Sequence, residues 1–315
     1  MTIKIKKAFS LIEVIFVLVI LGIVASISSQ IIVQVYDNYI TQKALYKTTT
    51  KTELVANQIV NRLAHIINGT GIAKDLINPG FVEGTNWIKL EDIPATDNNF
   101  TAVEWIGYDN DSFSATASPL WSGIANYTSA TRESFNTPGS NLSLVATIMS
   151  NLSSGEVNLS NTNPAAVLFL EQANEYMTGL EYNPSCMGLI NPANTACIFP
   201  VKIGTATPND INLTFTRLNE PKIITERYKL AWSAFALVPI DPDGDGLFDL
   251  YLYSNYQPWN HENFADDGTP HLLMRNVSVF KFTENGGVIQ LKLCASENIG
   301  QNFNISSCKE KAIIR

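Results

Sequence analysis

The sequence predicts an α+β fold in which one long N-terminal helix, membrane-spanning in its first part, packs on an antiparallel β-sheet domain. Two observations lead to this prediction. A helical pattern of apolar residues continues from the N-terminus to about residue 67 without a proline. Beyond residue 165, segments rich in aromatic and β-branched residues alternate with turn signals, which is typical of antiparallel strands.

The first apolar segment has no charged residue from Val14 to Tyr36, a span of 23 residues. A helix of roughly 20 apolar residues crosses the hydrocarbon core of a bilayer. Lys4, Lys6 and Lys7 precede the span, and basic residues favour the cytoplasmic side, so we expect the rest of the chain to be exported. No Ala-x-Ala-type cleavage site follows the span, so we expect it to remain as an anchor.

The helical pattern continues past this span. The first convincing stop is the stretch INGTG, where Asn68 and Gly69 suit a left-handed C-cap. A helix over residues 9–67 is about 88 Å long at 1.5 Å per residue. Its weak point is Tyr46–Glu53, where threonines lower the helix propensity and could let the rod bend.

One carboxylate, Glu13, lies at the start of the apolar run. A charged side chain inside a bilayer costs a few kcal/mol and usually has a partner or lies on a pathway. The alternative is that Glu13 lies close enough to the cytoplasmic interface to reach water. The residues alone leave both interpretations open.

The segment KKAFSLIEVIFVLVILGIVA places Ala8 and Phe9 behind basic residues, then three residues, then Glu13 and an apolar helix. This order resembles the leader junction and N-terminal helix of type IV pilins and type II secretion pseudopilins. The resemblance implies that prepilin peptidase removes leader residues 1–8 by cutting between Ala8 and Phe9, and that the new Phe9 amine is methylated. Ala8 departs from the family, which usually has Gly there. Gln30 stands where many pilins have a kinking proline, which favours a pseudopilin or minor pilin.

The resemblance also assigns a role to Glu13, which would pair with the Phe9 amine of a neighbouring subunit. An unpaired charge in a low-dielectric environment is costly, so the pair would select the correct register of an entering subunit. The implied partners are other pilin or pseudopilin subunits, prepilin peptidase and the inner membrane. The implied location is a single-pass inner-membrane protein with a cytoplasmic N-terminus and a periplasmic C-terminal domain, later part of a periplasmic or cell-surface filament.

The exported part divides near residue 165. Residues 68–165 are rich in Asn, Ser and Thr and read mostly as loops, with short strands or a helix possible at 143–152. Residues 166–315 are β-rich, with hairpins expected at Asp241–Gly246 and Glu284–Gly287. The expected strands lie within residues 165–171, 212–218, 227–240, 247–256, 271–284 and 287–295.

Three Asn-x-Ser/Thr triplets, at Asn99, Asn158 and Asn212, have an acidic residue two positions earlier. This pattern resembles the acceptor sequence of bacterial N-glycosylation. A chain so rich in Asn, Ser and Thr also forms such triplets by chance, so the sequence leaves their role open.

The four cysteines form two short-range pairs, Cys186 with Cys197 and Cys294 with Cys308. Neither pair has the spacing of a zinc or redox motif. In an oxidising compartment two local disulfides are expected, each worth about 2–4 kcal/mol. In the cytosol the same residues would be four buried thiols, so the predicted export decides between the two interpretations.

An acidic loop, DPDGDGLFD, covers residues 241–249. Calcium prefers six to eight oxygen ligands, and such loops supply them from alternate positions. Here these are Asp241, Asp243, Asp245, the Leu247 carbonyl and Asp249. Leu252 replaces the bidentate Glu of an EF-hand, so the loop is more similar to the calcium turns of thrombospondin-type and FG-GAP repeats. The missing ligand could come from Glu262, Asp266 or Asp267, and the alternative is a solvated hairpin tip.

Charge and motifs restrict the function further. The formal net charge of −8 and the single basic residue between Lys89 and Lys202, Arg132, make direct nucleic-acid binding unexpected. No nucleophile-elbow, nucleotide-loop or zinc-protease motif occurs, and the histidines at 65, 261 and 271 are poorly spaced for zinc, so we expect no enzyme. The expected function is a structural filament subunit, minor and near the tip because of its size, with a structural calcium ion. The alternative is a calcium-stabilised, adhesin-like or cargo-binding module anchored in the membrane.

Overall fold

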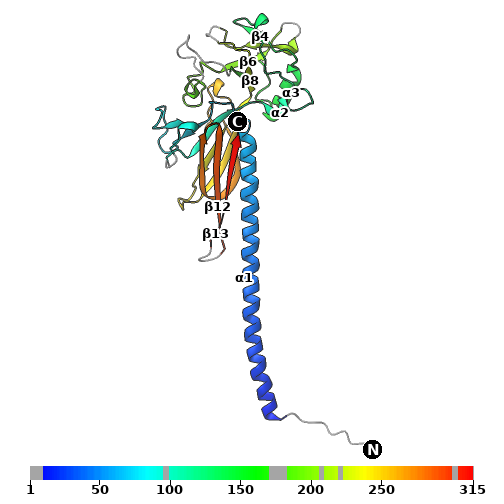
Figure 1. The fold of residues 1–315 in the computed structure, drawn as a ribbon, viewed down its shortest axis with the longest axis vertical. Helices are drawn as coiled ribbons and strands as arrows, with labels where there is room; N and C mark the ends of the chain where they lie inside the picture. Colours follow the sequence, from blue (N-terminus) through cyan, green and yellow to red (C-terminus); the bar gives the residue numbers. More distant parts are fainter. Residues whose placement is uncertain are drawn as a thin grey trace, which may run out of the picture.

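The computed structural model describes residues 10–94, 99–169, 183–205, 209–218, 223–299 and 304–314. A single helix, α1 (Leu11–Leu63), forms a rod whose C-terminal half lies against a β-rich head and whose N-terminal half projects away from it (Figure 1). Its 53 residues correspond to about 80 Å. This arrangement is the predicted α+β fold.

The C-terminal half of α1 is held by one apolar stripe. Its buried residues follow helical spacing, and they are Thr48, Thr52, Val55, Ala56, Ile59 and Leu63. The expected weak point does not interrupt the helix. The two threonines face the sheet, and the Thr52 hydroxyl donates a 2.7 Å hydrogen bond to the Thr48 carbonyl. Tertiary packing therefore outweighs their low propensity.

The helix ends four residues earlier than the predicted 67. Ile67 already belongs to the sheet region, because its N–H donates to the Ile106 carbonyl at 2.9 Å. Ile66 and Ile67 are both buried in the head. Gly69 has a positive φ of 76°, but it lies in the turn that follows rather than at the helix cap.

The head is built on an eight-stranded antiparallel sheet in the order β13-β12-β11-β10-β9-β3-β1-β2. Helix α1 packs on one face over β11–β13. Both predicted hairpins are present, β9–β10 and β11–β12. The strands of this sheet are β1 (Ile72–Lys74), β2 (Trp87–Lys89), β3 (Ala102–Gly107), β9 (Ser233–Ile240), β10 (Phe248–Tyr256), β11 (Thr269–Asn285), β12 (Val288–Asn298) and β13 (Asn304–Ile314).

A second lobe, residues 108–232, is inserted between two neighbouring strands of this sheet. Gly107 at the end of β3 and Ser233 at the start of β9 are register partners, so the chain leaves and re-enters the sheet at the same place. The lobe has a five-stranded sheet in the order β4-β7-β6-β5-β8. Its elements are α2 (Asn110–Phe113), β4 (Ser134–Asn136), α3 (Leu142–Leu152), β5 (Ala165–Phe169), β6 (Phe199–Ile203), β7 (Asn212–Phe215) and β8 (Tyr228–Ala231).

The inserted lobe lies at the end of the molecule opposite the free half of α1 (Figure 1). An aromatic core fills it, with Phe135 in contact with the rings of Phe169, Phe215 and Tyr228. A further apolar cluster joins the lobe to the main sheet, so the two parts share buried surface. The predicted division at residue 165 falls at the first residue of β5, inside this lobe.

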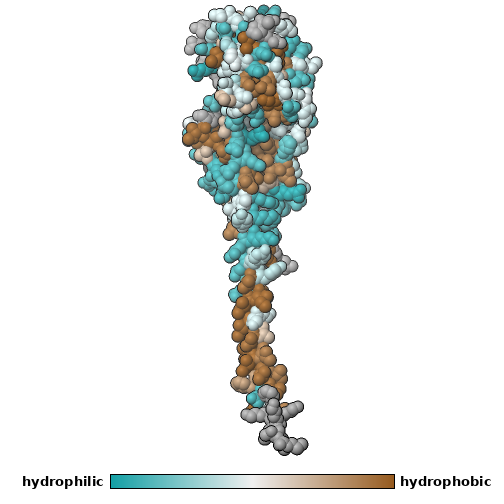
Figure 2. All heavy atoms as spheres, turned by 90° about the vertical axis from the view of Figure 1, so that its right-hand side faces the viewer, coloured by the Kyte–Doolittle hydropathy of each residue, from teal (hydrophilic) through white to brown (hydrophobic). Residues whose placement is uncertain are grey.

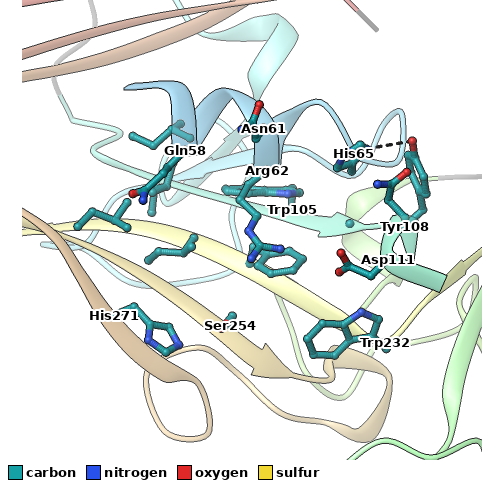
Figure 3. Close-up of a pocket in the computed structure, with 17 residues that line it drawn as sticks. Gln58, Asn61, Arg62, His65, Trp105, Tyr108, Asp111, Trp232, Ser254 and His271 are labelled. Carbon is teal, nitrogen blue, oxygen red and sulfur yellow. Dashed lines mark hydrogen bonds between the residues drawn. The ribbon is translucent and has the colours of Figure 1, made fainter. Parts of the chain in front are cut away.

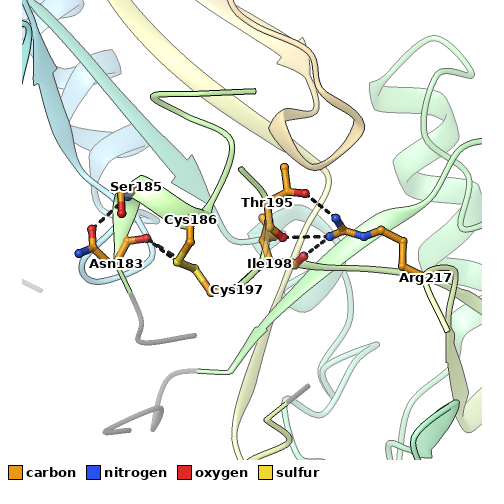
Figure 4. The surroundings of a disulfide bond; sticks show 7 residues. All are labelled: Asn183, Ser185, Cys186, Thr195, Cys197, Ile198 and Arg217. Carbon is orange, nitrogen blue, oxygen red and sulfur yellow. Dashed lines mark hydrogen bonds between the residues drawn. A yellow bond between two sulfur atoms is a disulfide. The ribbon is translucent and has the colours of Figure 1, made fainter. Parts of the chain in front are cut away.

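The cysteines form the two expected disulfides, Cys186–Cys197 and Cys294–Cys308. Cys294 and Cys308 are opposite residues of β12 and β13. The other disulfide closes a loop of the inserted lobe that Arg217 also holds, by donating to the Thr195 and Ile198 carbonyls (Figure 4). The first bond restrains a loop with little regular structure, and the second joins the edge strand β13 to β12.

Candidate functional site

The free half of α1 exposes its apolar side chains on every side. None of its most apolar 18-residue window is buried inside the molecule. Figure 2 shows the same region as a hydrophobic cylinder below a largely hydrophilic neck. A helix that is apolar all round needs an apolar environment, either lipid or other helices. This half of α1 is therefore long and apolar enough to anchor the chain in a membrane.

Glu13 lies in the first turn of α1. Its backbone N–H donates to the carbonyl of Ser10, the N-cap residue, at 3.0 Å. A carboxylate in a first turn interacts favourably with the helix dipole. The side chain is exposed, among exposed apolar neighbours such as Ile12 and Phe16. Ala8 and Phe9, the predicted processing residues, lie outside the described residues.

The acidic loop brings three of the predicted ligands together. One carboxylate oxygen from each of Asp241, Asp243 and Asp245 lies within 4.8 Å of the others, and all three residues are exposed. Asp241 organises the turn, because its carboxylate accepts hydrogen bonds from the N–H groups of Gly244 at 2.8 Å and Gly246 at 3.1 Å. Both glycines have positive φ, at 75° and 83°, which other residues rarely adopt.

The backbone also affects the ionisation of Asp241. Partial desolvation is the largest single influence and would raise its pKa. The N–H groups of residues 243–246 outweigh it together, so that the pKa lies below the usual value. Asp241 is thus ionised through the neutral pH range, as a cation ligand must be.

The other predicted ligands lie elsewhere. Asp249 is in β10, where its carboxylate is 3.8 Å from the Arg275 guanidinium, and it is not part of the three-carboxylate group. Leu247 follows the turn, and its N–H donates to Asp245 at 2.8 Å. Glu262 accepts from the Gln257 N–H at 2.7 Å. Asp266 and Asp267 accept hydrogen bonds from Asn263 within their own loop.

A groove of about 550 Å³ lies beside the C-terminal end of α1, over β3 and β9–β11 (Figure 3). The stacked rings of Trp105 and Phe235, with centroids 5.8 Å apart, form its aromatic floor. The Arg62 guanidinium lies over the Phe235 ring, 5.6 Å from its centroid. His65 Nδ1 is 3.0 Å from the Tyr108 hydroxyl. Burial lowers the pKa of His65, which favours the neutral imidazole.

The histidines do not form a metal group within the described residues. His65 and His271 both line the groove, whereas His261 lies outside it, with Nδ1 bonded to the Pro192 carbonyl. Sequence reasoning did not bring His65 and His271 together, because they are distant in the chain and meet only where α1 crosses the sheet.

Sequence reasoning also missed a buried ion pair. Lys74 of β1 lies 2.5 Å from Glu104 of β3, and Glu104 accepts a 2.8 Å hydrogen bond from the Tyr256 hydroxyl. The Lys74 ammonium also donates to the Leu189 carbonyl in the disulfide loop. The sequence offered one signal of this ion pair, the single acid Glu104 within the apolar segment TAVEWIG. The network fixes the inserted lobe to the main sheet.

Comparisons with known proteins agree with the N-terminal resemblance. Residues 3–29 match the family model of the prokaryotic N-terminal methylation motif. No curated protein and no solved structure matches the chain. The chain therefore carries the N-terminal segment of type IV pilin-like proteins and pseudopilins, joined to a head for which the comparisons offer no counterpart.

Proposed function

We propose that this chain is a structural subunit, a minor pseudopilin or minor pilin, of a type II secretion or type IV pilus-like filament. The observation that carries the proposal is the methylation motif at residues 3–29 on a helix whose apolar half projects free of the head. Prepilin peptidase would remove residues 1–8, and Glu13 would then face the Phe9 amine of a neighbour. The chemistry of a buried charge pair makes this contact selective for register.

The proposed topology places the N-terminus in the cytoplasm, α1 across the inner membrane and the head in the periplasm. The basic leader favours this orientation. The two disulfides support it, because such bonds persist in oxidising compartments. Inclusion in a filament would then move the subunit out of the membrane, with neighbouring helices replacing lipid around the apolar half of α1.

The shape of the head supports a position at the filament tip. The inserted lobe lies at the pole opposite the anchor (Figure 1). If this chain were the repeating subunit, each layer of the filament would have to make room for the inserted lobe, the 125 residues 108–232. A single terminal position avoids this requirement, so we assign the chain to a minor, tip-proximal role.

We further propose a structural calcium ion at the acidic turn, held by Asp241, Asp243 and Asp245. Three exposed carboxylates whose oxygens lie within 4.8 Å repel one another unless a cation neutralises them. The Leu247 carbonyl and water would complete the oxygen shell, and Asp249 would join if it exchanged Arg275 for the ion. Such an ion would order the β9–β10 hairpin rather than perform chemistry.

A second candidate function is that of an adhesin-like or cargo-binding module. The groove beside α1 favours it, because it combines an aromatic floor with the exposed guanidinium of Arg62. The two functions differ in the effect of deleting the gene. Loss of the filament indicates an assembly subunit, whereas normal filaments that fail only in attachment or secretion indicate the binding module.

The proposal is tested with Glu13→Ala and its charge-preserving control Glu13→Asp, each expressed in place of the native chain. We expect both variants to be processed, and only Glu13→Ala to be absent from sheared filaments while remaining in the membrane. A tip subunit should also be far less abundant in the filament fraction than the major subunit. Normal incorporation of Glu13→Ala would contradict the proposed role of Glu13.

A further inference from the structure

The structure separates the acid-preceded Asn-x-Ser/Thr triplets by their accessibility. Asn212 lies within β7, is 6% exposed, and donates from its side-chain amide to Asn136 at 2.7 Å. This amide cannot be reached in the folded chain. Asp97, the acid that precedes the Asn99 triplet, lies outside the described residues.

Asn158 is in a different situation. It lies in the loop after α3, in the distal lobe, and it is half-buried. Its side-chain oxygen accepts a 3.1 Å hydrogen bond from the Ser160 N–H, whereas its amide nitrogen donates no hydrogen bond to any described residue. The sugar is attached to this nitrogen in a glycan acceptor, and here no hydrogen bond within the described residues occupies it.

The residues around Asn158 hold the triplet in a bend. Leu159 has a positive φ of 55° and is buried, so it anchors the middle of the triplet. The Ser160 hydroxyl lies 3.2 Å from that of Thr162 and accepts from the Asn163 N–H at the same distance. The amide of Asn158 and the hydroxyl of Ser160 are thus fixed at one bend of the chain, where a transferase could read both.

Glu156 supplies the acidic position of the triplet. It is exposed, two residues before Asn158, and only one of its carboxylate oxygens accepts a hydrogen bond within the described residues, from the side-chain amide of Asn255. The other oxygen remains open to a basic side chain of an enzyme. Charge-assisted contacts to a carboxylate are stronger than neutral ones, so an accessible acid is an effective recognition feature.

We propose that Asn158 is an N-glycosylation site for a bacterial oligosaccharyltransferase that reads an acid at the second preceding position. The donor is a lipid-linked oligosaccharyl pyrophosphate. The bond between sugar C1 and the phosphate oxygen breaks, a bond between C1 and Asn158 Nδ2 forms, the lipid pyrophosphate leaves, and a base of the transferase takes the amide proton. A glycan there would cover the loop after α3 on the exported lobe.

The site is tested by peptide mass spectrometry of the full-length protein recovered from membranes of its native cells. Because no Lys or Arg occurs between Arg132 and Lys202, a protease other than trypsin is needed to isolate the Asn158 peptide. We expect a glycan mass on this peptide and none on the peptide with Asn212. An unmodified Asn158 peptide throughout the population would overturn the proposal.

Variants separate recognition from folding. Asn158→Gln should remove the glycan completely, and Glu156→Gln should lower its occupancy about tenfold, whereas Glu156→Asp should retain it. Ser160→Ala should abolish the modification and Ser160→Thr should restore it. Equal occupancy in Glu156→Gln and Glu156→Asp would refute reading of the acid. The N-terminal peptide of the same digest reports processing, so failure of the glycan proposal is distinguishable from failure of the filament proposal.

Discussion

Asp241 shows how one side chain can shape a turn and a potential cation site together. Its carboxylate binds the N–H groups of Gly244 and Gly246, which draws the backbone around it. The same fold brings Asp243 and Asp245 alongside. Repulsion among the three carboxylates opposes the turn, and a bound calcium ion would reverse the sign of that contribution.

The proposed calcium site predicts a buffer-dependent effect of mutation. Asp243→Ala combined with Asp245→Ala should lower the melting temperature by about 5 °C in saturating calcium, because ligand binding adds a few kcal/mol of stability to the native protein only. In a chelator the variant should melt no lower than the native chain, because the ion is absent and the variant has lost the repulsion among the carboxylates. Asp266→Ala with Asp267→Ala is the matched control: it retains the three proposed ligands, so its difference in melting temperature from the native chain should be the same in both buffers. Equal shifts in both buffers would contradict the site.

Asp109 is a buried carboxylate at the junction between β3 and the inserted lobe. It is 1% exposed, and its side chain caps α2 by accepting from the Ser112 N–H at 3.1 Å. Burial raises its pKa to about 6, against the smaller opposing effect of the Ser112 hydroxyl and N–H. Its charge is therefore a cost to the folded state at neutral pH.

The sign of this cost gives a pH-dependent prediction. A carboxyl whose pKa is higher in the folded state favours folding below about pH 4, and this contribution is lost as the pH rises through 6. Asp109→Asn keeps a side-chain oxygen for the cap without the charge, so it should raise the free energy of unfolding by about 3 kcal/mol at pH 7.5 and change it little at about pH 3.5. Urea titrations at the two pH values measure this. A gain of the same size at both would contradict the assignment.

Helix α1 is attached to the head by few residues. Its stripe of buried side chains spans only Thr48 to Leu63, with Glu53 at the margin bonded to Lys309 at 3.2 Å and to Lys311 at 2.5 Å on β13. Exposed ion pairs contribute little, so most of the attachment comes from apolar burial. The element divides into an anchored half and a free half without any break in the helix.

This division predicts unequal effects of two similar truncations. Ile59 is 1% exposed and Leu54 is 59% exposed, one and a half turns apart on the same helix. Ile59→Ala should lower the free energy of unfolding of the head by about 2–4 kcal/mol, and Leu54→Ala should change it by less than about 0.5 kcal/mol. Denaturant titrations followed by tryptophan fluorescence compare the two. Similar losses would show that α1 does not pack as described.

The strands that the sequence predicted share strong local signals. The hairpins β9–β10 and β11–β12 have turn residues flanked by aromatic and β-branched segments, and both lie where expected. The anchor helix was visible from its long apolar run, whereas the segment of α3 could be read as short strands or as a helix, and the structure shows the helix. At the candidate site, the acidic turn was predicted because calcium-type loops depend on local sequence.

The elements that escaped prediction depend on contacts distant in sequence. Strand β13 is polar, and only Ile305, Ser307 and Ile313 are buried along it, because it lies at the sheet edge beneath α1. Strand β3 is buried on both faces, so it lacks alternation and even contains Glu104. The groove beside α1 and the insertion between β3 and β9 are likewise products of topology that no local pattern reveals.

The whole molecule arranges three structural parts along one axis. An apolar helix half lies at one end, a sheet that holds the helix in the middle, and an inserted lobe at the other end (Figure 1). Because the lobe enters between β3 and β9 at paired residues, the sheet remains continuous beneath it. The arrangement is suited to a subunit that is held by its N-terminal half and presents its distal lobe outward.

The most direct test of this account is the mass of the N-terminal peptide of the protein recovered from membranes. We predict a chain that begins at a methylated Phe9, without residues 1–8, because the methylation motif at residues 3–29 implies processing by prepilin peptidase. A chain that still begins at Met1 would contradict the account and leave a membrane-anchored protein outside the pilin pathway.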